Sequence, residues 1–217
     1  MKFAPVKIPT FIQRFFPNYV WDFSSKEKIL YLTFDDGPTP EITQWTLNTL
    51  EKYNAKATYF CIGNNITKHP DVFKAVLSAG HSIGNHTQDH LKGWQNSTKK
   101  FLENVVKADS VITKKLENSS QKPKLFRPPF GQLKKSQGKA IIQLGYKIIM
   151  WSVVAFDWEH EITKEQCLKN VICNASSKNN IVVFHDSVKA SKNMMYALPK
   201  VLEYFSKKGY VFKAINT

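Results

Sequence analysis

Residues Ile29-Leu-Tyr-Leu-Thr-Phe-Asp-Asp-Gly-Pro38 give the clearest indication of the fold. Their β-favouring run ends in two aspartates and a Gly-Pro turn, and residues 40–53 then carry apolar side chains at helical spacing. The stretch therefore predicts a strand, a turn and a helix. Adjacent carboxylates at a strand end point in different directions and can do separate jobs around one centre, although turn-forming, helix-capping aspartates would leave the same pattern.

The same alternation of strand and helix recurs along the chain. We expect further strands in residues 57–62, 81–85, 125–127, 147–151, 181–184 and 210–214, with helical stretches between them. Because strands separated by helices need parallel pairing with crossover connections, we expect a barrel-like or open α/β sheet. The loops after the strands meet at one edge of such a sheet, and chemistry gathers there.

Composition excludes several classes of function. The 217 residues carry a net charge of +14, but all except two of the 31 basic residues are lysines, which lack the planar fork that reads base edges. The aromatic residues do not alternate with lysines as a base-stacking platform requires, so we expect no nucleic-acid partner, and a basic nucleic-acid-binding protein stays only as the less favoured alternative function. The three cysteines have no CxxC spacing, which argues against a disulfide framework or a thiolate metal site.

The first 28 residues form an aromatic leader that we expect to pack on a single domain at residues 29–217. Prolines and charges interrupt its apolar runs, so we expect no signal peptide and therefore a cytoplasmic protein. We also expect a monomer. The leader either seals the bottom of the barrel or faces an anionic lipid surface, which would place the protein peripherally at the inner membrane face.

The histidines His86 and His90 are the first candidate metal ligands. On a helix, a spacing of four places two imidazoles on one face about 5–6 Å apart, close enough to share a zinc ion. Asp36 would complete a triad that leaves coordination positions open for water and substrate. His185 follows the strand at 181–184 and could be a further metal ligand, a proton donor or a helix cap.

The segment Arg127-Pro-Pro-Phe130 contains candidate hydrogen-bond donors rather than metal ligands. An arginine in a chain that otherwise uses lysine suggests a site that needs a bidentate clamp on a carboxylate. Since proline has no N–H, the first backbone donor after Arg127 belongs to Phe130, and this donor could face an oxyanion.

These motifs appear in the order seen in the polysaccharide deacetylases, the carbohydrate esterases with a NodB-like domain, and the chain resembles that family across about residues 29–214. The segments that carry the resemblance are Thr33-Phe-Asp-Asp-Gly-Pro38, His81-Ser-Ile-Gly-Asn-His-Thr-Gln-Asp-His90, Arg127-Pro-Pro-Phe130, Asp157-Trp158 and Val183-Phe-His-Asp186.

The resemblance implies a distorted (β/α)7 barrel that holds one divalent metal, usually zinc, between Asp36, His86 and His90. Cobalt or nickel would fit the same ligands. It also implies Asp35 as general base and His185 as general acid. The implied reaction is hydrolysis of an acetyl group, N-acetyl in preference to O-acetyl, from a sugar or polysaccharide.

The remaining roles are also implied by the resemblance. Arg127 would hold the base carboxylate and the backbone N–H of Phe130 would bind the oxyanion. Trp158 and Val183 would line the pocket for the acetyl methyl group.

One position departs from the family pattern. Many relatives have another aspartate three residues before the Asp-Trp pair that orients the acid histidine, and Val154 occupies that position here. Either Asp157 takes over the role or the histidine is held less firmly. The second case keeps open a sugar-binding module that has lost turnover.

Overall fold

A curled parallel sheet forms the centre of the molecule, as a computed structural model shows for residues 5–23, 26–116, 124–175 and 180–216. The strands pair in the order β1-β6-β5-β4-β3-β2-β8-β7, and β9 pairs with β2. The strands are β1 (Tyr19–Val20), β2 (Ile29–Asp35), β3 (Thr58–Cys61), β4 (Ser82–Asn85), β5 (Lys124–Phe126), β6 (Tyr146–Ile149), β7 (Val153–Val154), β8 (Ile181–His185) and β9 (Val211–Phe212). The expected distorted β/α barrel is confirmed.

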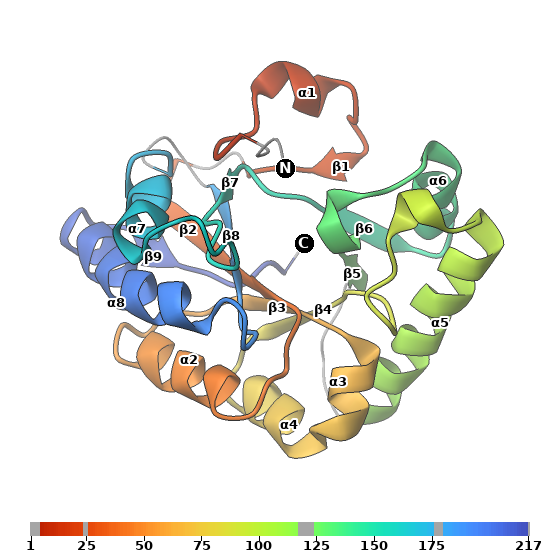
Figure 1. Cartoon of the computed structure of the whole chain (residues 1–217), viewed down its shortest axis with the longest axis horizontal. Helices are drawn as coiled ribbons and strands as arrows, with labels where there is room; N and C mark the ends of the chain where they lie inside the picture. The colour runs from red at the N-terminus through yellow and green to blue at the C-terminus, as the bar shows by residue number, and fades with distance from the viewer. Residues whose placement is uncertain (1–4, 24–25, 117–123, 176–179, 217) are drawn as a thin grey trace.

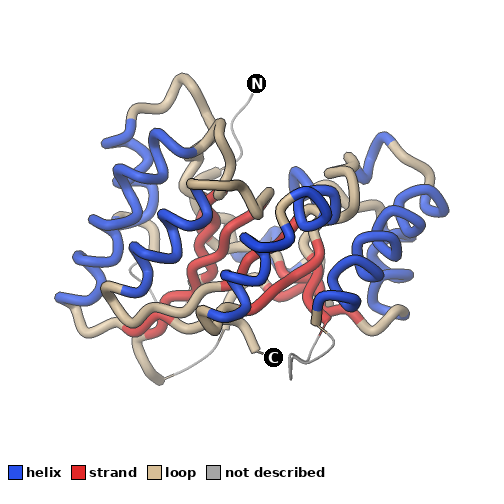
Figure 2. Tube along the Cα trace, turned by 90° about the horizontal axis from the view of Figure 1, so that it is seen from below, coloured by secondary structure: helices blue, strands red, loops and turns tan. Residues whose placement is uncertain are grey.

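Helices surround the outside of this sheet and leave the strand ends open (Figures 1 and 2). They are α1 (Thr10–Arg14), α2 (Ile42–Glu51), α3 (Gly63–Lys68), α4 (Pro70–Ser78), α5 (Thr98–Lys115), α6 (Lys135–Gln143), α7 (Lys164–Ile172) and α8 (Ser191–Lys207), with 3-10 turns η1 (Gly93–Gln95) and η2 (Pro129–Gly131). Local sequence sets several of their starts, because Ser97 and Thr163 cap α5 and α7 and Pro70 opens α4.

The central strand β2 is covered on both faces, which explains its nearly continuous apolar sequence. Phe34 faces outward and stacks with Tyr59 of β3 and Phe184 of β8, in the main core between the sheet and its helices. Phe60 and Ile181 belong to a second cluster, made with residues of β5, β6 and the C-terminal segment. This alternation along β3 and β8 places successive side chains inside and outside the barrel.

The leader joins the two edges of the sheet. Residues 6–8 run antiparallel to β7, where Ile8 N–H donates to the Ser152 carbonyl and Val154 N–H donates to the Val6 carbonyl, both at 2.9 Å. β1 pairs with β6 at the opposite edge, and Figure 1 shows α1 and β1 between β7 and β6. The leader therefore bridges the gap in the barrel side.

The barrel bottom is covered by the other end of the chain, contrary to the expectation that the leader seals it. Ile215 is buried in the interior cluster, and its N–H donates to Thr58 Oγ1 at the start of β3. Ser82, at the start of β4, bonds to Asn216.

Four short elements were not predicted from the sequence: α1, β1, α3 and β7. Each is too short to display a period, and β1 and β7 exist because neighbouring edges pair with them. No helix among the described residues is long and apolar enough to cross a membrane.

Deleting residues 1–22 should lower the melting temperature by about 6–12 °C. The deletion removes three backbone hydrogen bonds to residues 150–154 together with the packing of Tyr19 and Trp21 on the core cluster at β5 and β6, a loss of about 3 kcal/mol in the free energy of unfolding. Differential scanning calorimetry measures the change. An unchanged melting temperature would show that the leader does not brace the barrel gap.

Candidate active site

The strand ends bring the predicted polar residues together at one edge of the barrel. Asp35 ends β2 and His185 ends β8, and these two residues are opposite one another in the register of the adjacent strands. Asp36, His86, Arg127 and Asp157 follow β2, β4, β5 and β7. The sheet topology therefore collects side chains that are far apart in sequence, as a barrel of parallel strands must.

Asp36, His86 and His90 form a cluster that fits a metal ion. Asp36 Oδ1 lies 3.7 Å from His86 Nε2 and 3.2 Å from His90 Nε2, and the three ligand atoms lie within 4.8 Å of one another. A tetrahedral site with bonds of about 2.0–2.1 Å separates its ligand atoms by about 3.3 Å. Asp36 Oδ1 is buried without a hydrogen-bond partner, so it has a vacant lone pair that a cation would satisfy.

The histidines come together in a loop, so the helical geometry that places residues four apart on one face does not apply to them. Residues 86–90 have no helical structure, and Thr87 and His90 have φ values of 67° and 54°. The ring centroids of His86 and His90 are nevertheless 5.1 Å apart. Asn85 Oδ1 accepts from Thr87 N–H at 2.8 Å, and Asn104 Oδ1 accepts from two further backbone N–H groups of the loop.

The surroundings of the two histidines suit metal ligation. The Nδ1 of His86 lies 2.8 Å from the carbonyl oxygen of Arg127, which can only accept, so Nδ1 carries the proton and Nε2 faces Asp36 unprotonated. Burial, followed by repulsion from His90, lowers the pKa of His86 to about 3, and burial also lowers the pKa of His90. Both rings are therefore neutral at pH 7, as ligands must be.

The backbone of Asp36 is held from both sides. Its φ of 80° is costly for a residue with a side chain, so its neighbours must fix it. The Asp36 carbonyl accepts from Asn65 Nδ2 at 2.7 Å, and Gly37 N–H donates to Asp186 Oδ1 at 3.0 Å. Asp186 is fully buried, and a Cβ on Gly37 would lie 2.1 Å from its carboxylate.

Sequence reasoning missed this support for Asp36. Asp186 was visible beside His185, but nothing in the sequence assigned it a partner. Asn65 carries no motif at all, and its position depends on helix α3, which was not predicted.

Arg127 holds the carboxylate of Asp35 in a fully buried ion pair. Its Nη1 donates to Asp35 Oδ1 at 2.8 Å and to Thr33 Oγ1 at 2.6 Å. Nε and Nη2 donate to the carbonyls of Ile149 and Met150. These two bonds fix the guanidinium of Arg127 at the end of β6. Arg127 therefore holds the Asp35 carboxylate in one orientation.

Asp157 holds His185, while Val154 lies in an apolar cluster. Asp157 Oδ1 lies 2.9 Å from His185 Nδ1, and its Oδ2 accepts from the His185 backbone N–H at 2.7 Å. Burial by itself lowers the pKa of His185, but Asp157, with smaller contributions from Asp36 and Asp35, raises it to about 9. His185 is therefore protonated at neutral pH. It keeps a carboxylate partner, Asp157, although Val154 stands where many relatives have a further aspartate.

The apolar residues of the site lie beside this pair. Val183 packs with Val154 and Phe156, and Trp158 contacts the same cluster. The ring of Trp158 also meets the ring of His185 edge-on at 4.4 Å.

Phe130 lies on the other side of the site, in turn η2. Its φ is 58°, and its ring lies 4.5 Å from that of His90. The two hydrogen bonds of the turn come from the N–H groups of Gly131 and Gln132 rather than from Phe130. The Phe130 N–H thus takes no part in closing the turn.

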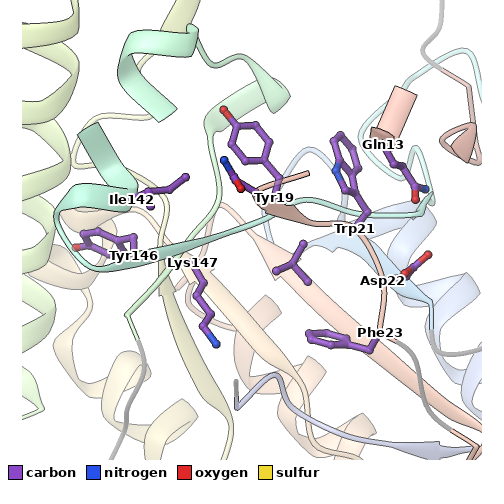
Figure 3. A pocket seen from close by; sticks show the side chains of 10 residues that line it. Gln13, Tyr19, Trp21, Asp22, Phe23, Ile142, Tyr146 and Lys147 are labelled. Atoms are coloured by element: carbon purple, nitrogen blue, oxygen red, sulfur yellow. The ribbon is translucent and has the colours of Figure 1, made fainter. Parts of the chain in front are cut away.

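A cavity of about 650 Å³ lies away from these residues, between the leader and β6 (Figure 3). Its walls include Tyr19, Trp21, Phe23, Tyr146 and Lys147, and it shares no lining residue with the cluster at Asp36. It therefore belongs to the packing of the leader and not to the strand-end site.

Comparison with known proteins identifies the class. The polysaccharide deacetylase family model matches residues 23–149, and the chain belongs to this family. It is a hydrolase that removes acetyl groups from sugar polymers.

Individual relatives are similar along most of the chain. A Bacillus cereus peptidoglycan-N-acetylglucosamine deacetylase is 37% identical over 199 residues, which is 90% of each chain. Chitin deacetylase 2 of Saccharomyces cerevisiae is 29% identical and is matched over 78% of this chain and 54% of its own. The crystal structure of the Bc1960 peptidoglycan N-acetylglucosamine deacetylase superposes with a TM-score of 0.85 at 27% identity, covering 96% of this chain and 95% of that one.

His86→Ala and Asp36→Ala should each abolish binding of about one equivalent of divalent metal, because each removes one of the three candidate ligands. Elemental analysis of dialysed protein measures the content. Asp71→Ala, which removes an exposed carboxylate on α4, is the matched control and should keep the metal. Full metal content in the His86 and Asp36 variants would contradict the assignment.

Proposed function

We propose that the protein is a zinc-dependent N-deacetylase that acts on N-acetylglucosamine in peptidoglycan or its precursors. The observation that carries the proposal is the position of the Asp36–His86–His90 cluster beside an opposed acid and base, His185 and Asp35. The bacterial relatives are peptidoglycan N-acetylglucosamine deacetylases, which supports this substrate.

Zinc is the metal that the ligand set favours. Two neutral imidazoles and one carboxylate are typical of catalytic zinc sites with open positions, and cobalt or nickel would bind the same atoms. A divalent cation held there supplies Lewis acidity, which acidifies water and polarises the amide carbonyl.

Side chains of the protein carry out the proton transfers. Asp35, oriented by Arg127, accepts a proton from the water that attacks the acetyl carbonyl carbon. The Phe130 N–H donates to the oxygen that becomes negative, a contribution of about 2.7–4 kcal/mol for comparable donors.

Collapse of the tetrahedral intermediate needs the acid. The C–N bond breaks as His185 gives its proton to the departing nitrogen, because an amide anion is too basic to leave. The products are acetate and a free amino sugar. Trp158 and Val183 form the apolar wall against which the acetyl methyl packs.

The location of the protein stays a prediction. A cytoplasmic enzyme would meet lipid-linked precursors, whereas an exported one would meet finished polymer. The net charge of +14 favours an anionic substrate in either place.

Acetate release from peptidoglycan fragments, from a lipid-linked precursor and from chitotetraose tests the function. Asp35→Asn and His185→Ala should each lower kcat by at least about 10²-fold, as expected for loss of general base or acid, while keeping the metal. No acetate from any substrate would leave the sugar-binding module as the better description. Near-normal kcat in Asp35→Asn would contradict its role as base.

Asp157→Asn should move the alkaline limb of the kcat/KM profile to lower pH. His185 must be protonated to act, and the Asp157 charge raises its pKa, so the neutral amide lets burial lower that pKa. A cation at Asp36 lowers the pKa of His185 in both proteins, which leaves the direction of the difference unchanged. An unmoved alkaline limb would show that Asp157 does not tune the acid.

A further inference from the structure

Three large side chains stay exposed on the segments that flank the metal cluster. Phe130 and Trp94 are 54% and 62% exposed, although both are large hydrophobic residues in a well-packed domain. Lys92 is also exposed and lies two residues after the ligand His90. The function proposed above gives none of these side chains a role.

Two of these side chains, Phe130 and Lys92, lie beside the candidate metal ligand His90. The ring of Phe130 lies 4.5 Å from the ring of His90, and Lys92 Nζ lies 5.1 Å from the centroid of the Phe130 ring. Lys92 makes no ion pair among the described residues, so its charge is available to a ligand.

The segment that carries Lys92 and Trp94 is fixed against the segment that carries Phe130. A Cβ on Gly93 would lie 2.1 Å from the Gln132 carbonyl oxygen, so the two backbones are in close contact. Gln137 Nε2 donates to the carbonyls of Gly93 and Asn96 at 2.9 and 3.3 Å. The exposed side chains are therefore held on a shared backbone support, which reduces the entropy lost on binding.

Each side chain suits part of an acidic sugar. The C–H face of a pyranose ring is apolar and can pack on an exposed aromatic ring. A lysine ammonium attracts a carboxylate as a compact point charge. The surface adjoins the place where the acetyl group must react, so a sugar packed on it belongs to the same glycan as the acetylated one.

We propose that Lys92, Phe130 and Trp94 form a subsite for the sugar next to the acetylated one, and that Lys92 selects a carboxylate on that sugar. This inference rests on the proposed function and narrows its substrate class to acidic glycans. In glycan strands freed of their stem peptides, the lactyl group of muramic acid supplies such a carboxylate next to N-acetylglucosamine, whereas a lactyl group that still carries a stem peptide is a neutral amide.

The test compares two substrates that differ in one group. The first is a tetrasaccharide of alternating N-acetylglucosamine and N-acetylmuramic acid, and the second is the same molecule with its carboxylates converted to methylamides. The readout is the ratio of kcat/KM for the acidic and neutral forms, from initial rates of acetate release by the metal-loaded enzyme.

Lys92→Met should lower this ratio about three- to fivefold, the effect of one partly exposed charge pair, and should do so through KM. Lys92→Arg should keep the ratio. Lys107→Met removes the same charge from the exposed side of α5 and should also leave the ratio unchanged. Trp94→Ala should raise KM for both substrates alike, because stacking does not depend on the carboxylate.

Several results would overturn the inference. The wild type could turn over both substrates equally, or Lys92→Met and Lys107→Met could change the ratio to the same extent, which would mean that only net charge matters. Either result leaves acetate release intact and therefore spares the proposed function. No release from either substrate or from chitotetraose would overturn both.

Discussion

The buried ion pair between Arg127 and Asp35 is the interaction on which the strand-end site depends. A guanidinium with no exposure to water is tolerated only if its donors are satisfied, and here they bond to β2 and to the carbonyls at the end of β6. Removing either partner would leave a buried charge unpaired, at a cost of about 3–5 kcal/mol. The same contacts that make the pair tolerable also fix the base between two strand ends.

Backbone strain is concentrated around this pair. Asp36, Thr87, His90, Phe130 and Phe156 all have positive φ, and all lie in loops after strand ends. Such residues cost about 1–3 kcal/mol each and persist only when their surroundings fix them. Carboxamides and a buried carboxylate do this for two of the loops: Asn65 and Asp186 around Asp36, and Asn85 and Asn104 around Thr87.

The unpaired edges of the open barrel explain why the leader lies where it does. An open sheet presents unpaired backbone groups at both ends, which are costly to bury and prone to wrong pairing. Residues 6–8 satisfy the edge of β7, and β1 satisfies the edge of β6. The aromatic residues of the leader have two environments. Phe16 packs with Tyr19 and Trp21, while Phe11 and Phe15 remain exposed.

From the sequence alone we predicted a parallel α/β sheet and candidate polar residues at its strand ends, because both follow from local signals, whereas Asp157, Trp158 and Val183 were indicated only by the family resemblance. Apolar runs at strand length, helical spacing between them and polar residues at each strand end are all visible along the chain. The sequence also indicated that Phe130 has the first backbone donor after two prolines.

How these residues meet depends on contacts between segments that are distant in the sequence. His86 and His90 converge because a loop with two left-handed residues is held by Asn85 and Asn104, and helical geometry does not apply to them. Asp157 pairs with His185 because β7 and β8 are neighbours in the sheet. Asp186 and Asn65 reach the Asp36 turn from distant elements, and the leader joins two edges that are far apart in sequence. Pairing across such distances depends on sheet order and loop geometry, which no local pattern encodes.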